Sequence, residues 1–132
     1  MTAHLPDSGD RSNFDTGAVR DASVGKGVPS NISPKALRRI AKRFEDGAAK
    51  YSQFNCYKGI PINRYIDSLY RHLWSYIEGD TSEDHLGAIG WNAVMLIDTA
   101  ERIDEGTLPA ELDDRLCRFL TNLAQTDEKE SV

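Results

Sequence analysis

The segment EDHLGAIGWNAVMLIDTAERI, residues 83–103, decides the fold class of this 132-residue chain. Between Leu86 and Ile97 the only strongly polar side chain is that of Asn92. A helix that is apolar on all sides is buried among other elements of a domain. The segment is therefore expected to form a central helix that other helices surround.

Amphipathic segments on both sides predict further helices. Ser33 and Pro34 mark the start of the first helix, Thr81 or Ser82 is expected to cap the third, and Pro109 to begin the last. The four expected helices span residues 34–50, 63–78, 83–104 and 110–125. Because the loops between them are short and no strand pattern is evident, the fold class is all-α, a four-helix bundle.

The two ends of the chain differ in texture from the helical region at 31–125. Ten of the first thirty residues are Gly, Ser or Pro, and neither 1–30 nor 126–132 shows an apolar period. Such segments cannot bury enough apolar surface to compensate for the entropy lost on ordering. We therefore predict one helical domain, a partly disordered N-terminal arm that is flexible or docked, and a disordered tail.

Charge and composition limit the function. The chain carries 16 Lys and Arg against 21 Asp and Glu, a net charge of −5, which argues against direct DNA binding. It has no run of about 18 apolar residues and no secretory signal, so we expect no membrane segment. Cys56 and Cys117 are expected to be free thiols in a reducing cytosol, which indicates a cytoplasmic protein.

Three charged side chains and a tryptophan follow one edge of the 63–78 helix. Asp67, Arg71, Trp74 and Glu78 recur there at helical spacing. Two interpretations remain open. Asp67 and Arg71 form either a surface ion pair or a carboxylate for a hard metal ion beside a guanidinium for phosphate.

Other candidates lie near helix ends and inside the apolar helix. His85 is either a capping or core histidine or a ligand, and Asn92 either specifies the fold or serves a site. Glu45 and Asp84 are carboxylates of the kind that bind Mg²⁺. The cations around the aromatic loop 51–63 are either solvated or positioned for phosphate; they are Lys50, Lys58 and Arg64.

Several strings together resemble one family. They are GAVRD (17–21), GKGVPSNISPKALRRIAKRFEDGAAKY (25–51), N-x-x-K-G-x-P (55–61), RYIDSLYRHLWSYIEGD (64–80), EDHLGAIGWNAVMLIDTAERI (83–103) and LPAELDD (108–114). In order and spacing they are similar to the phage dATP/dGTP diphosphohydrolases. These are the MazZ-type proteins, which are distantly related to the MazG nucleotide pyrophosphohydrolases.

The resemblance implies an all-α, MazG-like enzyme that cleaves dATP or dGTP to the monophosphate and pyrophosphate with Mg²⁺ or Mn²⁺. In a phage that makes 2-aminoadenine DNA, it would remove dATP and supply dGMP in the host cytoplasm. Sites of the wider superfamily are built across subunit contacts, which implies a homodimer or homotetramer. Because GAVRD and GKG lie in the arm, the arm is expected to dock at the site.

MazG proteins usually carry EExxE on one helix and ExxD on the next, and neither motif is present here. On the matching strings we expect Glu45, Asp67, Asp84 and His85 to bind metal, with Glu45, Asp67 and His85 as catalytic residues. Expected substrate contacts are phosphate-binding Lys50, Lys58, Arg64 and Arg71, base- or sugar-binding Asn55 and Asn92, and a stacking ring from Tyr51, Trp74 or Trp91.

Two other functions stay open. A non-enzymatic helical phage protein would bind a host factor through its acidic surface, without metal dependence. A housecleaning enzyme would keep the chemistry but act on modified deoxynucleotides. Pyrophosphate release from a panel of nucleotides separates all three.

Overall fold

The computed structural model describes residues 5–130. The chain divides into two compact units, with the boundary between Ser33 and Pro34. Different kinds of interaction stabilise the two units. Hydrogen bonds and ion pairs hold the first together, and helix packing holds the second.

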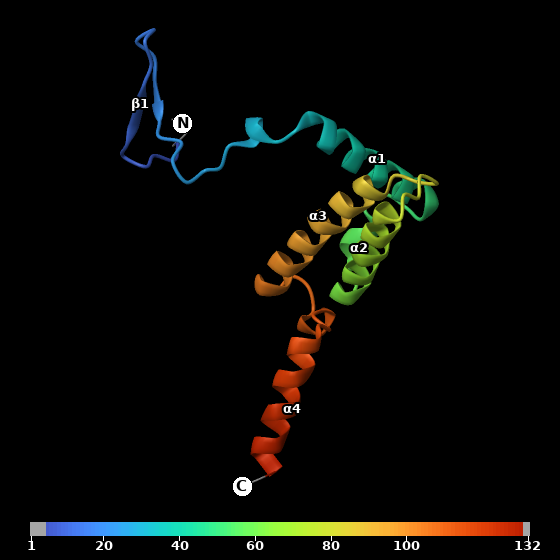
Figure 1. Cartoon of the computed structure of the whole chain (residues 1–132). Coiled ribbons are helices and arrows are strands. Elements are labelled where there is room, and N and C mark those ends of the chain that lie inside the picture. The colour runs from blue at the N-terminus through green and yellow to red at the C-terminus, as the bar shows by residue number, and fades with distance from the viewer. Residues whose placement is uncertain (1–4, 131–132) are drawn as a thin grey trace. The chain divides into compact units, whose positions relative to one another are not determined.

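The first unit contains a small antiparallel hairpin (Figure 1). Its strands are β1 (Arg11–Asn13) and β2 (Val19–Asp21), and Ser12 pairs with Arg20 at the centre. Gly17, in the connection between them, has a φ of 87°, which favours glycine. The sequence did not indicate strands here, because three residues are too few to show an alternating apolar pattern.

Asp21 supplies much of the side-chain bonding in this unit. Its carboxylate accepts hydrogen bonds from the Ser8 hydroxyl and from the Lys26 ammonium group, the latter at 2.9 Å. It also lies 3.4 Å from the guanidinium of Arg11. The hydrogen bonds from Ser8 and Lys26 lower the pKa of Asp21, so its carboxylate is ionised at neutral pH. Polar contacts thus join the segments of the described part of the arm.

Helices form most of the second unit. Those in its described part are α1 (Pro34–Lys50), α2 (Ile62–Ile77), α3 (His85–Asp104) and α4 (Leu116–Glu130). Single 3₁₀ turns in the described chain span Pro29–Asn31, Asn55–Lys58 and Ala110–Leu112. The predicted all-α class and the four helices are confirmed, with a small hairpin in addition. Both cysteines are free, as expected.

The apolar helix α3 is central, because α1 and α2 both pack against it (Figure 1). Its Ala88, Met95 and Thr99 are buried, with 0 to 2% of their surface exposed. Gly90 lets α1 approach closely, since a Cβ atom there would lie 2.8 Å from Cγ1 of Ile40. The expectation of a central helix drawn from residues 83–103 therefore agrees with the packing of α1 and α2, but α3 is not covered on all sides, because Leu86, Val94 and Ile97 are exposed.

The start of α3 differs from the prediction. Asp84 is the N-cap, and its carboxylate accepts a hydrogen bond from the backbone N–H of Gly87 at 3.0 Å. The expectation that Thr81 or Ser82 caps the helix is wrong. The Ser82 hydroxyl donates instead to the carboxylate of Asp80, at 2.7 Å.

The last helix begins at Leu116 rather than directly after Pro109. Ala110–Leu112 forms a single 3₁₀ turn. Asp114 then accepts two hydrogen bonds from Asn63 at the start of α2, one to its carboxylate from the backbone N–H (2.9 Å) and one to its carbonyl from the side-chain amide (2.7 Å). These tertiary bonds hold the chain in a connection before α4 can begin.

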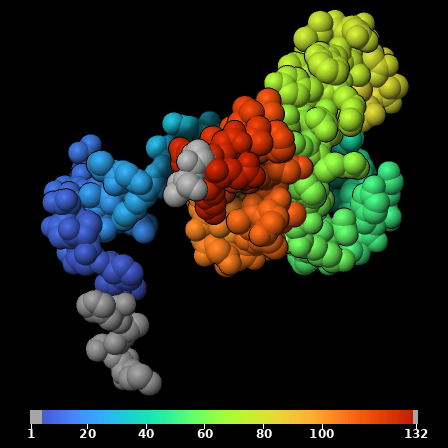
Figure 2. Space-filling view, turned by 90° about the horizontal axis from the view of Figure 1, so that it is seen from below, coloured from blue at the N-terminus to red at the C-terminus, as the bar shows by residue number. Residues whose placement is uncertain are grey.

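The apolar stripe of α4 is exposed, and no described residue of this helix is buried. The stripe consists of Leu116, Phe119, Leu120 and Leu123. In the space-filling view α4 lies at the surface, coloured red (Figure 2). The helix continues to Glu130, through the described part of the segment predicted as a disordered tail. Each described helix is too short or too polar to span a bilayer.

Candidate metal centre

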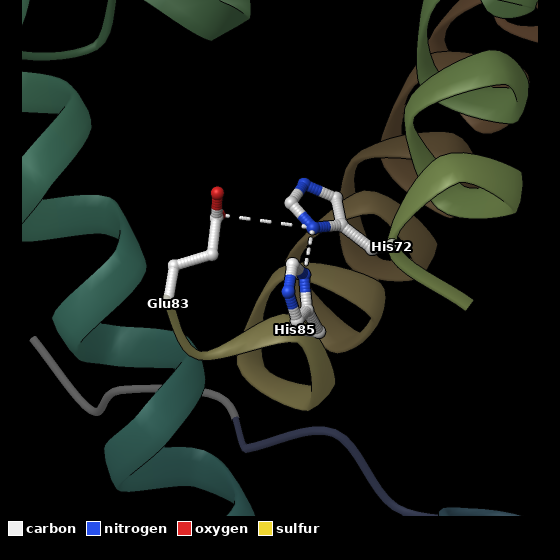
Figure 3. A group of neighbouring side chains, drawn as sticks. All are labelled: His72, Glu83 and His85. Atoms are coloured by element: carbon white, nitrogen blue, oxygen red, sulfur yellow. Dashed lines mark hydrogen bonds and ion pairs between the residues drawn. The ribbon is translucent and has the colours of Figure 1, made fainter. Parts of the chain in front are cut away.

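Three side chains of the kinds that bind metal ions meet where α2 ends and α3 begins (Figure 3). They are His72 of α2, Glu83 of the connection and His85, the first residue of α3. Nδ1 of His72 lies 2.8 Å from Nδ1 of His85 and 3.7 Å from a carboxylate oxygen of Glu83. The three candidate ligand atoms lie within 4.8 Å of one another.

A tight connection brings these residues together. Gly79 has a φ of 83°, and its N–H donates to the carbonyl of Tyr76 at 3.1 Å, which terminates α2. The chain then reverses over a few residues, and Asp84 caps the next helix. As a result, His72 and His85 lie side by side although 13 positions separate them in the sequence.

Polar groups surround the cluster. Arg43 of α1 donates to the carboxylate of Glu83 at 3.1 Å and lies 3.4 Å from Nε2 of His72. On the other side, Nε2 of His85 hydrogen-bonds the carboxylate of Asp80. A carboxylate on the distal nitrogen of a histidine fixes the ring orientation in many metal sites.

The electrostatics favour a neutral His72. Burial is the main cause that lowers its pKa; Arg43 and His85 act in the same direction, and Glu83 opposes them. Hydrogen bonds from Ser82 and His85 lower the pKa of Asp80. Since metal ions bind the neutral imidazole, His72 keeps a usable lone pair to lower pH than an exposed histidine would.

The donor set tests the expected metals. Two imidazole nitrogens with one carboxylate suit first-row ions such as Mn²⁺, Fe²⁺ or Zn²⁺, whereas Mg²⁺ prefers oxygen ligands. His85 is only 6% exposed, while the Glu83 side chain is 45% exposed, so the cluster is open to solvent on the carboxylate side. The residues therefore fit Mn²⁺ better than Mg²⁺.

A cavity of about 700 Å³ adjoins this cluster. Small-molecule sites typically measure roughly 300–1,000 Å³. The second half of α1, the loop 51–57 and the middle of α3 line it, and its rings are Phe44, Tyr51, Phe54, Tyr57 and Trp91. Lys50 and Arg43 are the cations of the lining. Because Arg43 also contacts Glu83, this one side chain joins the cavity to the cluster.

Two residues that line the cavity each have a buried polar atom with no hydrogen-bond partner among the described residues. These atoms are Nε1 of Trp91 and Oδ1 of Asn92. Asn92 is 2% exposed, and its Nδ2 donates to the carbonyl of Ala88 at 2.8 Å, which fixes the orientation of the amide. Buried polar atoms in native proteins nearly always have partners. This end of the cavity therefore carries a donor and an acceptor whose hydrogen-bonding capacity the described residues leave unused.

The predicted site residues fall into four groups. His85 belongs to the cluster, and six others line the cavity: Glu45, Lys50, Tyr51, Asn55, Trp91 and Asn92. Asp84 pairs with Arg39 of α1, and hydrogen bonds from Arg39 and the Gly87 backbone lower its pKa to about 2. The remaining four are exposed and belong to neither cluster nor cavity lining: Lys58, Arg64, Asp67 and Arg71. Their roles remain predictions.

Sequence reasoning missed Arg43, His72 and Glu83 as members of the site. At helical spacing His72 lies on the side of Tyr65 and Tyr76, away from the charged edge, and Glu83 is one of several acidic residues near helix ends. The usable signal was the short turn at residues 79–82, which indicates that two helix ends lie close together. It does not show that His72 and His85 face each other, because that depends on the angle between the helices.

These observations define a class, a small helical protein with a histidine–carboxylate centre beside a cavity of nucleotide size. The family model described as "dATP/dGTP diphosphohydrolase, N-terminal" matches residues 16–108. The chain belongs to this family, which confirms the resemblance seen in its motifs. The matched segment includes the whole cluster and the whole cavity lining. Neither curated proteins nor solved structures gave a match.

Proposed function

We propose that the protein hydrolyses dATP and dGTP to the monophosphate and pyrophosphate, using a divalent ion held by His72, Glu83 and His85. The observation that carries this proposal is Arg43, which contacts the cluster and lines the cavity. A metal centre and a nucleotide-sized cavity that share one cation suit a metal–triphosphate substrate. The family description supports the choice of purine deoxynucleotides.

A divalent ion bound at the cluster would polarise a phosphate and lower the pKa of an attacking water. The side chains of the protein supply the rest. Asp80 keeps the His85 ring in position, and Lys50 with Arg43 neutralises charge that develops on the phosphate oxygens. Glu45, an exposed carboxylate of the cavity lining, is our proposed acceptor for the proton of the water.

The aromatic end of the cavity is our proposed base site. Both purines present an N–H donor beside a ring or carbonyl acceptor, which matches Oδ1 of Asn92 and Nε1–H of Trp91. Both atoms are closed off from solvent, so a base would reach them only after neighbouring side chains move. Our proposed stacking partner for the base is the exposed ring of Tyr51, which lines the cavity.

In the cell this activity would adjust the deoxynucleotide pool. In a phage that builds 2-aminoadenine DNA, it would remove dATP and supply dGMP. A homodimer or homotetramer is part of the same proposal, and the exposed apolar side chains of α2 and α4 support it.

The test uses EDTA-treated full-length protein with each dNTP and Mn²⁺, Mg²⁺ or no metal, followed by assays for pyrophosphate and monophosphate. We expect release from dATP and dGTP with Mn²⁺, less with Mg²⁺, and none in EDTA. His72→Ala and His85→Ala should lose the activity, while His72→Ala keeps the helical circular dichroism spectrum.

Absence of pyrophosphate from every nucleotide with every metal would contradict the proposal and favour the host-factor protein. Release only from modified deoxynucleotides added to the panel would instead identify a housecleaning enzyme. The three candidate functions thus give three different results in one assay.

A further inference from the structure

Arg43 sits where two different anions would compete for it. Its guanidinium donates to Glu83 at 3.1 Å and approaches Nε2 of His72 at 3.4 Å. The side chain is 33% exposed and also lines the cavity. It can therefore reach the metal-binding side chains or a ligand in the cavity.

The contact with His72 fixes where its proton lies. Arginine has only donors and stays protonated, so Nε2 of His72 must offer a lone pair. A neutral His72 then carries its proton on Nδ1, which points at Nδ1 of His85 at 2.8 Å. His85 in turn carries its proton on Nε2 and donates to Asp80. One set of protons satisfies the whole chain of contacts from Arg43 to Asp80.

This arrangement excludes a metal ion at the same atoms. A cation bound at Nδ1 of His72 requires the ring proton to move to Nε2, where Arg43 offers only further protons. The guanidinium and a divalent ion would also share one carboxylate, that of Glu83, and two cations at such short range repel each other. Metal binding must therefore break the contacts of Arg43 with the cluster.

We propose that Arg43 is a cationic placeholder. It holds Glu83 and His72 while no metal is bound, and it turns into the cavity when a divalent cation binds, where it binds the phosphate of a nucleotide. The second half rests on the proposed function. Arg43 thus weakens metal binding by the free protein and strengthens binding of an anion by the metal-loaded protein.

The first experiment measures Mn²⁺ binding to EDTA-treated full-length protein by calorimetry, with no nucleotide present. Arg43→Met removes the competing charge-assisted hydrogen bonds and should bind Mn²⁺ about tenfold more tightly. Arg38→Met removes the same charge from an exposed position of α1 and should leave the affinity within about twofold of wild type. Equal or weaker binding by Arg43→Met would overturn the proposal, as would no Mn²⁺ binding by the wild type.

The second experiment measures dGMP binding in saturating Mn²⁺. Arg43→Met should weaken it about tenfold, Arg43→Lys less, and Arg38→Met not at all. A variant that merely loosened the fold would weaken both ligands, whereas the placeholder predicts opposite changes. Unchanged dGMP affinity in Arg43→Met would overturn the second half.

The outcomes separate this inference from the proposed function. If Arg43→Met binds Mn²⁺ more tightly but the wild type releases no pyrophosphate, the placeholder stands and the hydrolase does not. If the wild type hydrolyses dGTP while Arg43→Met binds Mn²⁺ as the wild type does, the hydrolase stands and the placeholder does not.

Discussion

Glu83 is the one carboxylate of the described metal cluster, and among the described residues the lysine or arginine that pairs with it is Arg43. A cation that binds there depends on the negative charge of this side chain more than on its shape. Asp67, which the motif-based reasoning put forward as a ligand, is exposed on α2 and outside the cluster. The two carboxylates therefore make a matched pair for mutation.

The first prediction concerns this pair. Glu83→Gln keeps the shape but removes the charge, and we expect Mn²⁺ affinity to fall by at least about 100-fold, beyond the usual effect of an outer partner. Pyrophosphate release should fall with it. Asp67→Asn, measured in the same titration, shows whether Asp67 belongs to the site. Normal Mn²⁺ affinity in Glu83→Gln would remove Glu83 from the centre.

A second prediction at this scale concerns pH. Because its hydrogen bonds lower the pKa of Asp21 below the ordinary value of 3.8, the folded hairpin binds fewer protons than the unfolded arm. Its contribution to stability is therefore complete above pH 3.8 and is lost as the pH falls through the lower, folded-state pKa.

The measurement is NMR of the amides of β1 and β2 across an acid titration. We expect strand-like shifts to persist at neutral pH and to collapse in strong acid. Asp21→Asn should collapse them at neutral pH as well. Asp15→Asn, in the connection between the strands, is the matched control and should leave them intact.

Among the elements, the contact of α1 with α3 depends on a glycine. A Cβ atom on Gly90 would lie 2.8 Å from Cγ1 of Ile40, which is closer than packed atoms approach. Overpacking typically lowers the free energy of unfolding by about 1–3 kcal/mol, while the higher helix propensity of alanine raises it by about 1 kcal/mol. We expect Gly90→Ala to lower the free energy of unfolding by up to about 2 kcal/mol in urea titrations.

Gly47 of α1 gives the comparison, because an added Cβ atom there meets nothing within 4 Å. Gly47→Ala should raise the free energy of unfolding by about 1 kcal/mol. Opposite signs for the same substitution in two helices would confirm that the close approach of α1 is responsible. A stabilising Gly90→Ala would show that Ile40 yields without cost.

Prediction from sequence succeeded for elements with a long apolar period and failed where tertiary contacts set the limits. The helix 34–50 was predicted at its actual bounds, since a proline start and an apolar stripe are local signals. The start of α4 was not, because Pro109 suits a 3₁₀ turn as well as an α-helix. The bonds of Asp114 to Asn63, which decide between the two, come from another part of the chain.

The candidate site was predictable only in part, for a similar reason. Six cavity residues were found from separate signals: Lys50, Tyr51 and Asn55 from the aromatic loop with its lysines, Asn92 from its place in an apolar helix, Glu45 as a carboxylate near a helix end, and Trp91 from the family resemblance. The metal cluster depends on how a seven-residue connection orients two helix ends, and spacing alone does not contain that angle. His85 was suggested by its position before an apolar helix, whereas no pattern in the sequence around His72 indicated a functional role.

For the whole molecule, the exposed stripe of α4 bears on the proposed assembly. Leu120 and its neighbours on this stripe are exposed, so little packing stabilises the helix. Short isolated helices are marginally stable in water. We expect sedimentation equilibrium to show a homodimer or homotetramer. Leu120→Glu should shift it towards monomer, while Gln125→Glu, on the opposite face, should not. A monomeric wild type would contradict the prediction.

Two arginines one helical turn apart on α1 bind consecutive carboxylates, Arg39 to Asp84 and Arg43 to Glu83. Of these two ion pairs, only that of Arg43 with Glu83 belongs to the cluster, because the carboxylate of Asp84 caps α3. If Arg43 releases Glu83, the ion pair of Arg39 with Asp84 still holds α1 in place. The binding of a metal ion at the centre would then change the cavity through the movement of the Arg43 side chain alone, with no helix displaced.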